Sequence, residues 1–274
     1  MAPLALSARP SLGPTLERLA GRGIRYLDLA VGDGPAAESG WIAPAALLEP
    51  ALLEERLAQV AIEAEFDDPR LLGTYLIEGY AHALVTPALG AYLTERRVPD
   101  VGPRAVALRL GEGAELTGVA YLAPRFGVLL DDAAATGPAA LPFATEAELM
   151  AWFRRRLVRH LAPLIAELVP RTRRGPRALW ASVEDTLTGI LDWLGGALDC
   201  AEWARGQADL LLGVEAPLSG RARWRALEHP GGVERFRERN GCCQYFRKGT
   251  EHGACFTCTR TSDEERIRRL AAEE

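Results

Sequence analysis

The sequence has no run of apolar residues that approaches the roughly eighteen needed to span a membrane. Residues 1–23 contain three prolines and lack the apolar stretch and cleavage site of a signal peptide. We therefore expect a cytoplasmic protein without a transmembrane segment. Lysine is almost absent, since Lys248 is the only lysine among 32 basic residues, and the net charge of −5 argues against a general nucleic-acid-binding protein.

Negative charge is concentrated in the first part of the chain. Residues 1–150 hold 11 basic and 20 acidic side chains, whereas residues 151–274 hold 21 basic and 17 acidic side chains. An anionic partner is therefore expected to dock on the second half. The excess of arginine is greatest over residues 219–250, where a solvated charged surface is the simpler interpretation.

The hydrophobic pattern predicts an α+β protein that is predominantly helical, with a small antiparallel sheet and a short C-terminal cysteine-rich module. Helical spacing of apolar residues predicts helices over about residues 45–66, 69–96, 145–169, 176–194 and 198–212. Short β-prone runs occur at residues 106–110, 116–122 and 126–130. We expect a helical body over residues 1–212, followed by a connection and the cysteine module over residues 213–274.

Four of the five cysteines fall within seventeen residues, as Cys242, Cys243, Cys255 and Cys258. The fifth, Cys200, lies on a predicted helix and is interpreted as a small buried apolar side chain. Disulfides are disfavoured in a cytoplasmic chain with an odd number of cysteines. Metal ligation is the economical interpretation of the clustered four.

The spacing of these cysteines suits two kinds of metal site. A Cys-x-x-Cys turn is used by zinc and by iron–sulfur proteins. Zinc sites usually repeat that turn or add spaced histidines, whereas here two adjacent cysteines leave the backbone in diverging directions. A two-iron cluster spreads its ligand sulfurs farther apart than a single ion does, so the pattern favours 2Fe-2S while zinc stays open.

The cysteine segment resembles a known family. Residues 240–247, Asn-Gly-Cys-Cys-Gln-Tyr-Phe-Arg, together with Cys-Phe-Thr-Cys at 255–258, are similar to the C-terminal signature of the FhuF-type ferric siderophore reductases. The resemblance extends upstream to residues 159–165 and to the helix with Leu179 and Trp180, and it covers about residues 45–260. Eleven residues separate the two cysteine pairs, one more than is usual in that family, which leaves the cluster potential open.

The resemblance implies a function and a ligand set. Cys242, Cys243, Cys255 and Cys258 would hold a 2Fe-2S cluster that reduces ferric siderophores by one electron. Because siderophore oxygens bind Fe3+ far more strongly than Fe2+, reduction would release Fe2+ in the cytoplasm. Electrons would come from a ferredoxin, a flavodoxin or an NAD(P)H-dependent reductase, in agreement with the lack of a glycine-rich dinucleotide motif after a strand. The helical body would supply a siderophore-facing cleft.

Three further side chains have competing interpretations. Arg247 and Lys248 could dock the siderophore or the electron donor, could stabilise a reduced cluster, or could be solvated loop charges. His160, among apolar helical residues, is most simply a satisfied core side chain. Two other functions also remain: a zinc-stabilised binding protein in which the four cysteines form a structural site, and an iron–sulfur sensor without turnover.

Overall fold

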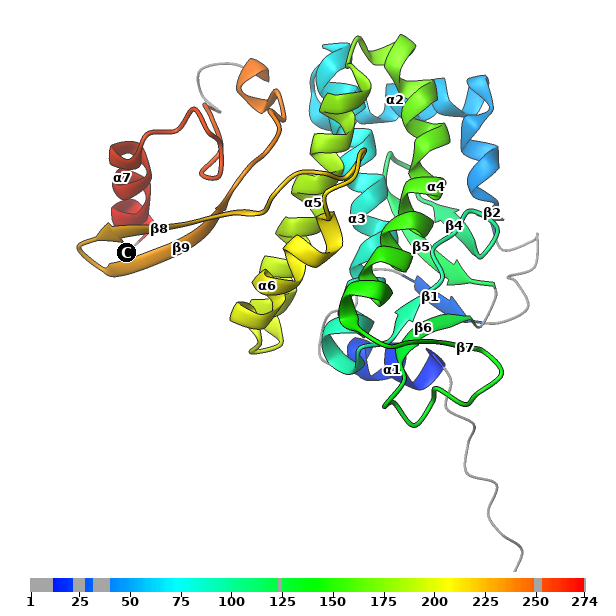
Figure 1. Ribbon diagram of the computed structural model, residues 1–274. Coiled ribbons are helices and arrows are strands. Elements are labelled where there is room, and N and C mark those ends of the chain that lie inside the picture. The colour runs from blue at the N-terminus through cyan, green and yellow to red at the C-terminus, as the bar shows by residue number, and fades with distance from the viewer. Residues whose placement is uncertain (1–11, 22–27, 32–39, 123–124, 249–252, 274) are drawn as a thin grey trace, which may run out of the picture.

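The computed structural model describes residues 12–21, 28–31, 40–122, 125–248 and 253–273. In these ranges the chain is mostly helical and has small sheets, so the predicted α+β class is confirmed (Figure 1). The helices are α1 (Leu12–Gly21), α2 (Pro50–Ala64), α3 (Pro69–Glu95), α4 (Glu146–Thr172), α5 (Pro176–Ala197), α6 (Ala201–Leu212) and α7 (Asp263–Glu273). No helix within the described ranges is both long enough and apolar enough to cross a membrane.

Local sequence signals place the ends of the helices. The Thr145 hydroxyl accepts a hydrogen bond from the Glu148 amide, and the Glu148 carboxylate accepts one from the Ala144 amide, which starts α4. Pro50 occupies the first turn of α2, so the helix expected over residues 45–66 is preceded by a separate 3-10 turn, η2 (Pro44–Leu48). Pro87 lies inside α3 without dividing it.

The strands differ from the single antiparallel sheet that the sequence predicts. They are β1 (Asp28–Val31), β2 (Trp41–Ile42), β3 (Val98–Pro99), β4 (Val106–Leu110), β5 (Leu116–Tyr121), β6 (Phe126–Leu129), β7 (Ala140–Phe143), β8 (Arg223–His229) and β9 (Gly232–Glu238). Their order is β1-β5-β4-β2 in one mixed sheet and β3-β6-β7 in another, with parallel pairs β1–β5 and β6–β7. The expectation of one sheet was wrong because β6 pairs with β3 and β7 and not with β5, while β5 takes the distant β1 as its second partner.

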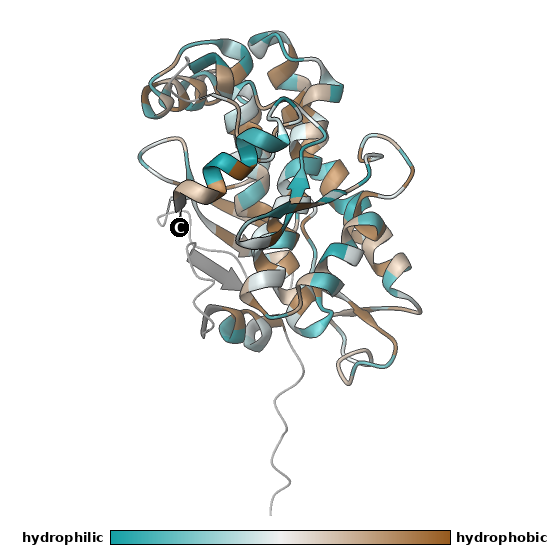
Figure 2. Cartoon of the chain, turned by 90° about the vertical axis from the view of Figure 1, so that its left-hand side faces the viewer, coloured by the Kyte–Doolittle hydropathy of each residue, from teal (hydrophilic) through white to brown (hydrophobic). Residues whose placement is uncertain are grey.

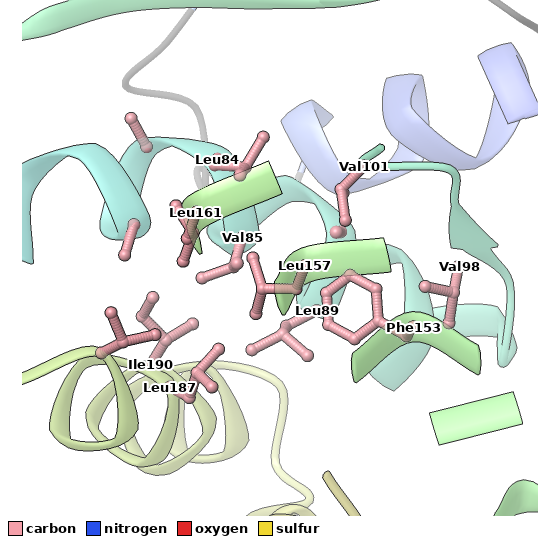
Figure 3. Packing of buried hydrophobic residues seen from close by; sticks show 14 of the residues in the cluster. Leu84, Val85, Leu89, Val98, Val101, Phe153, Leu157, Leu161, Leu187 and Ile190 are labelled. Carbon is pink, nitrogen blue, oxygen red and sulfur yellow. The ribbon is translucent and has the colours of Figure 1, made fainter. Parts of the chain in front are cut away.

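The core lies where α3 meets α4 and α5. Helix α3 is buried on almost all sides along its second half, so its apolar residues contact both neighbouring helices. Figure 3 shows this packing, with Leu84, Val85 and Leu89 of α3, Phe153, Leu157 and Leu161 of α4, and Leu187 and Ile190 of α5. Burial of such side chains contributes about 1.5–3 kcal/mol each. The three helices therefore form the rigid base on which the rest is arranged.

His160 is a satisfied core residue, as the sequence predicts. Its Nδ1 lies 2.6 Å from the Val101 carbonyl oxygen, which can only accept, so Nδ1 carries the proton. Its Nε2 then accepts from the Tyr80 hydroxyl at 2.5 Å. Burial lowers the pKa of His160 to about 4, although the hydrogen bond with Val101 acts in the opposite direction. The imidazole is therefore neutral in the folded protein near pH 7.

The C-terminal segment, residues 223–248 and 253–273, lies beside α5 and α6 and on the far side of them from β1 to β7 (Figure 1). Strands β8 and β9 form an antiparallel hairpin within the stretch that the sequence predicts to be a connection. The alternation of arginine and glutamate in these strands hides their β pattern. Figure 2 views the molecule from this side and shows a mostly hydrophilic α7 in front of the more hydrophobic helices.

Candidate functional site

The four clustered cysteines lie in one loop between β9 and α7. We call residues 240–261 the cysteine loop; its residues 249–252 lie outside those that the structure describes. Cys243 and Cys255 come together, and their thiols share a hydrogen bond. Cys258 is buried, and its amide donates to the Cys255 carbonyl oxygen at 3.0 Å, which closes the Cys-x-x-Cys turn.

The loop does not bring all four sulfurs into a single metal-binding group. Among the residues described by the structure, no three histidine, cysteine, aspartate or glutamate side chains are arranged to hold a metal ion. Cys243 and Cys255 therefore meet without Cys242 or Cys258 as a third member. Cys200 lies apart from the loop and packs against the hydrophobic core as a half-buried side chain.

Several polar groups point at the sulfurs. The Arg260 amide donates to Cys258 Sγ at 3.4 Å, and Thr257 Oγ1 lies 3.5 Å from Cys255 Sγ. The hydrogen bond with Cys243 is the largest cause that lowers the pKa of Cys255, with further contributions from the Thr257 hydroxyl and amide. The same pairing raises the pKa of Cys243. The loop thus favours a thiolate at Cys255.

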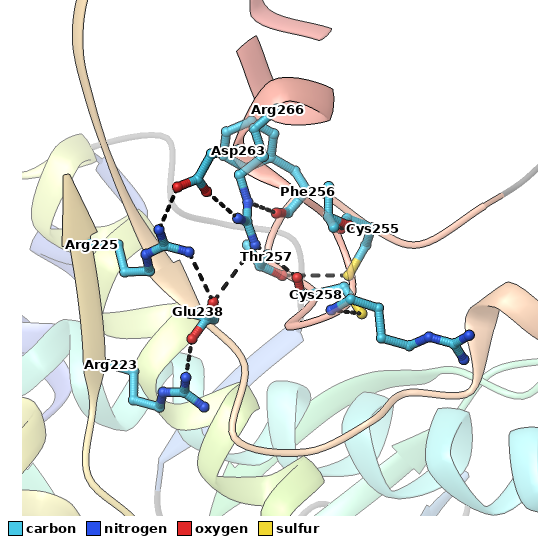
Figure 4. A network of polar contacts seen from close by, with 11 residues as sticks. Arg223, Arg225, Glu238, Cys255, Phe256, Thr257, Cys258, Asp263 and Arg266 are labelled. Carbon is cyan, nitrogen blue, oxygen red and sulfur yellow. Dashed lines mark hydrogen bonds and ion pairs between the residues drawn. The ribbon is translucent and has the colours of Figure 1, made fainter. Parts of the chain in front are cut away.

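Arg266 holds the Cys-x-x-Cys turn in place. Its side chain is 1% exposed, and its Nε and Nη2 donate to the carbonyl oxygens of Phe256 at 2.9 Å and Cys258 at 2.8 Å. Its Nη1 donates to Asp263 at 2.7 Å, as Figure 4 shows. The guanidinium also lies 4.8 Å from the centre of the Phe236 ring. One buried cation from α7 therefore joins β9, the turn and its own helix.

The hairpin supplies the anion that balances Arg266. Glu238 is buried at the end of β9, 3.7 Å from Arg266 and 3.2 Å from Arg225, and it also pairs with Arg223 (Figure 4). Arg225 reaches Asp263 at 2.7 Å. Several guanidinium partners offset the cost of burying this carboxylate. The cysteine loop is thereby fixed to the hairpin.

Asp185 of α5 anchors the other end of the loop to the helical core. It is 2% exposed, and its carboxylate accepts from the amides of Asn240 at 2.7 Å and Gly241 at 3.0 Å. A Cβ added at Gly241 would lie 2.9 Å from the Ala181 Cβ, so the close approach of this backbone to α5 requires glycine. The chain therefore enters Cys242 directly from the surface of α5.

Three largely buried arginines surround the cysteine pairs. Arg239 forms ion pairs with Glu78 of α3 and, at 3.2 Å, with Asp185, while Arg237 donates to Asp185 at 2.9 Å. Arg174 follows α4, and its Nη2 donates to the Cys242 carbonyl oxygen at 2.8 Å. The Nε of Arg174 is buried and has no hydrogen-bond partner among the described residues.

These arginines interact electrostatically with the thiols. Burial lowers the pKa of Arg174, and the charges of Cys242, Glu78 and Cys243 oppose that effect. Burial also lowers the pKa of Arg237, where Asp185 opposes it most and Glu78 and Cys255 add to the opposition. An arginine stays protonated even so, because its intrinsic pKa lies above 12. The site therefore has permanent positive charge on the side of the helical core.

Arg247 and Lys248 have other partners. Arg247 lies in the 3-10 turn η3 (Tyr245–Lys248) and donates to Asp68 at the start of α3 at 2.6 Å. The Lys248 ammonium lies 5.6 Å from the centre of the Tyr245 ring. Tyr245 in turn stacks on Tyr75 of α3, with ring centres 6.4 Å apart. A docking role for these two cations stays a prediction.

A pocket of about 360 Å³ lies between α3, α5 and β9. Its walls are formed by Glu78, Gly79, His82, Asp185, Thr186, Gly189, Ile190, Trp193, Arg237 and Arg239. Two of these residues, Arg237 and Arg239, are the arginines that interact with Cys255 and Cys243. The pocket also adjoins the start of the cysteine loop, because Asp185 lines it and accepts from the Asn240 and Gly241 amides.

Comparison with known proteins identifies the family. A family model described as ferric iron reductase FhuF-like transporter matches residues 75–230, more than half of the chain. The chain belongs to this FhuF-like ferric iron reductase family. The resemblance predicted from the cysteine segment is thus confirmed through a different part of the chain, because the match ends before Cys242. No curated protein matches the chain. Membership in the FhuF-like family supports a role in the reduction of ferric iron.

Sequence reasoning missed several residues of this FhuF-like site. Arg174 precedes Cys242 by 68 positions, and nothing in its local pattern separates it from the other arginines. Asp185 lies on a helix whose spacing of apolar residues predicts which face is buried. An aspartate on that face is the one sequence signal that could have identified Asp185 as a functional residue. Arg239 belongs to the basic stretch, which sequence analysis interprets most simply as a solvated surface.

Proposed function

We propose that this FhuF-like protein reduces ferric siderophores by one electron through a 2Fe-2S cluster held by Cys242, Cys243, Cys255 and Cys258. Fe2+ would be released in the cytoplasm, and a ferredoxin, a flavodoxin or an NAD(P)H-dependent reductase would supply the electrons. The observation that carries the proposal is the meeting of Cys243 with Cys255 in a member of the ferric iron reductase family.

The chemistry of the donor set supports a soft metal centre. Four thiols lie in a single loop, and Cys255 and Cys258 already accept hydrogen bonds from neighbouring amides. Amide hydrogen bonds to sulfur are among the features by which proteins adjust iron–sulfur potentials. Thiolates select zinc or iron–sulfur clusters over hard cations such as Mg²⁺. The chemistry of these four donors therefore supports the proposed group.

The surrounding side chains have separate tasks in the proposed reaction. The bound cluster would supply a single electron with little rearrangement of its ligands. Arg174 and Arg239 offset the negative charge that accumulates when four thiolates hold a reduced centre. Tyr75 stacks on Tyr245, and burial is the main cause that raises the pKa of Tyr75, with Tyr245 and the nearby Cys243 adding to the effect.

An anaerobic spectrum with metal analysis tests the proposal. Purified protein should be brown and contain iron and sulfide, and addition of a ferric siderophore to the reduced protein should restore the oxidised spectrum while an Fe2+ chelator reports the product. A colourless protein that contains zinc would establish the alternative of a structural zinc site. A cluster that no ferric chelate oxidises would establish the sensor alternative.

Serine variants test the ligand set. Cys242→Ser, Cys243→Ser, Cys255→Ser and Cys258→Ser should each lose iron and sulfide. Cys200→Ser is the matched control and should retain both, because Cys200 packs against the core away from the loop. The ligand set is wrong if Cys200→Ser loses iron and Cys243→Ser keeps a normal spectrum.

A further inference from the structure

Two glycines in helix interiors, Gly79 of α3 and Gly189 of α5, line the pocket between α3, α5 and β9. A Cβ added at Gly79 would have no atom within 4 Å, and one at Gly189 would meet only the Arg237 guanidinium, at 3.5–3.8 Å. Alanine would therefore fit at both positions. Glycine inside a helix costs about 0.5–1 kcal/mol relative to alanine. The helices forgo that stability at two positions that face the same pocket.

One wall of the pocket is aromatic and apolar. Trp193 is 46% exposed although it is a large hydrophobic residue, and its ring centre lies 6.5 Å from that of His82 with 29° between the ring planes. Ile190 extends this wall along α5. An exposed tryptophan at the mouth of a pocket offers a flat surface on which an organic ligand can pack.

The pocket also has a polar side, where the guanidinium groups of Arg237 and Arg239 pair with the carboxylates of Glu78 and Asp185. Arg237 uses Nη1 to bind Asp185, while its Nη2 and Nε lie 3.5 Å and 3.6 Å from the position that a Gly189 Cβ would occupy. These two nitrogens therefore face the space above Gly189. Arg239 lines the pocket from the same strand end and pairs with Glu78. Oxygen atoms with partial or full negative charge are the groups that a guanidinium edge recognises.

We propose that this pocket is the binding site for the ferric chelate, with an organic arm packed on Trp193 and iron-binding oxygens directed toward Arg237. The proposal rests on the proposed function. A volume of about 360 Å³ is at the lower end of small-molecule sites, so the pocket receives one edge of a hexadentate chelate. Asp185 lines the pocket and also accepts from the Asn240 and Gly241 amides at the start of the cysteine loop, so a chelate bound in the pocket would adjoin that loop.

The electron balance of the step is simple. A 2Fe-2S cluster held by the four cysteines would supply one electron, which would reduce the bound Fe3+ to Fe2+ without a covalent bond to the protein. A ferredoxin, a flavodoxin or an NAD(P)H-dependent reductase then returns the electron. Because the chelate holds Fe2+ weakly, the metal leaves and the free ligand departs from the pocket.

A pocket-filling variant with a matched control tests the site. Gly189→Leu should fill the pocket, whereas Gly196→Leu lies on the same helix at an exposed position with no atom within 4 Å of its added Cβ and does not line the pocket. Trp193→Ala is the second variant, because its side chain is exposed enough for removal to leave the fold intact. Each protein is titrated calorimetrically with the Ga3+ complexes of desferrioxamine, of a triscatecholate and of citrate, which cannot be reduced.

We expect at least one gallium complex to bind the unaltered protein, with its Kd raised at least tenfold by Gly189→Leu and by Trp193→Ala and less than twofold by Gly196→Leu. The visible spectrum and midpoint potential of the cluster should be the same in all four proteins. Equal affinity in Gly189→Leu and the unaltered protein overturns the site. So does an absence of gallium-complex binding in a protein whose reduced cluster is still oxidised by the ferric complexes. Failure of those complexes to oxidise the cluster overturns the proposed function instead.

Discussion

Replacement of Arg266 by methionine should release the Cys-x-x-Cys turn from the hairpin. The substitution keeps much of the side-chain volume but removes the hydrogen bonds to Phe256, Cys258 and Asp263 and the ion pair with Glu238. The guanidinium is 1% exposed, so water cannot replace these contacts without opening the structure. Loss of these contacts should therefore destabilise the whole cysteine loop.

The size of the effect follows from the burial of the network. Removing one partner of a buried ion pair destabilises by about 3–5 kcal/mol, because the other charge is left without compensation. Glu238 keeps Arg223 and Arg225 as partners, so we expect about 3 kcal/mol rather than 5 for Arg266→Met. Since about 1.4 kcal/mol is a factor of ten in an equilibrium constant, local opening should become about a hundredfold more frequent.

Hydrogen exchange measured by mass spectrometry resolves this opening. Peptides that cover residues 253–273 should exchange about a hundredfold faster in Arg266→Met, whereas peptides from α3 and α5 should be unchanged. The control is Arg268→Ala, in which an ion pair of α7 with a 75% exposed arginine is removed and the change should stay below about 0.5 kcal/mol. Equal protection in the two variants would refute the role assigned to Arg266.

Three further outcomes are expected. Arg174→Gln should lower the midpoint potential of the cluster, measured by a redox titration followed by electron paramagnetic resonance. A fall of about 59 mV corresponds to a tenfold change in the equilibrium constant of reduction. An unchanged potential would mean that this guanidinium only holds the Cys242 carbonyl. His160 has a pKa of about 4 in the folded protein, below its unfolded value of 6.5, so the unfolded state binds more protons between these two pH values. The free energy of unfolding, measured by urea denaturation, should therefore fall by about 3 kcal/mol as the pH is lowered from 6.5 to 4. His160→Gln should remove that slope. Replacing Arg247 and Lys248 with glutamine should slow reduction by an acidic donor at low salt, and stopped-flow measurements should find the difference smaller as salt is raised. A salt-independent defect with a large fall in cluster potential would show that the two cations act on the cluster instead.

Much of the helical architecture could be predicted because its determinants are local. The capping pair of Thr145 and Glu148 and the apolar spacing that follows place α4 within a few residues of its observed ends. The cysteine motif identified the family for the same reason, since the spacing of ligands along a short loop is a property of the sequence alone. Burial of His160 also followed from the apolar residues around it.

The sheets were predicted less well because strand pairing is a long-range property. β4 and β5 are neighbours in sequence and pair as expected, but β5 finds its second partner in β1 and β6 pairs with β7 in a parallel manner. No local pattern states which of several short β-prone runs will lie side by side. The β8–β9 hairpin was hidden by its charges, of which Arg223, Arg225 and Glu238 pair across the strands and Arg237 pairs with Asp185 of α5.

Only the tertiary structure decided what each charge does. Arginines look alike along the chain, yet Arg247 pairs with Asp68 at an exposed position, whereas Arg174 and Arg239 lie largely buried beside the cysteines. Asp185 became the anchor of the loop because the packing of α5 removes it from water and leaves two amides and two guanidinium groups as its partners. The energy of a charge depends on burial and on neighbours from distant segments. Sequence therefore determined the helices, the cysteine ligand candidates and the family, and folding determined which cations and which pocket adjoin them.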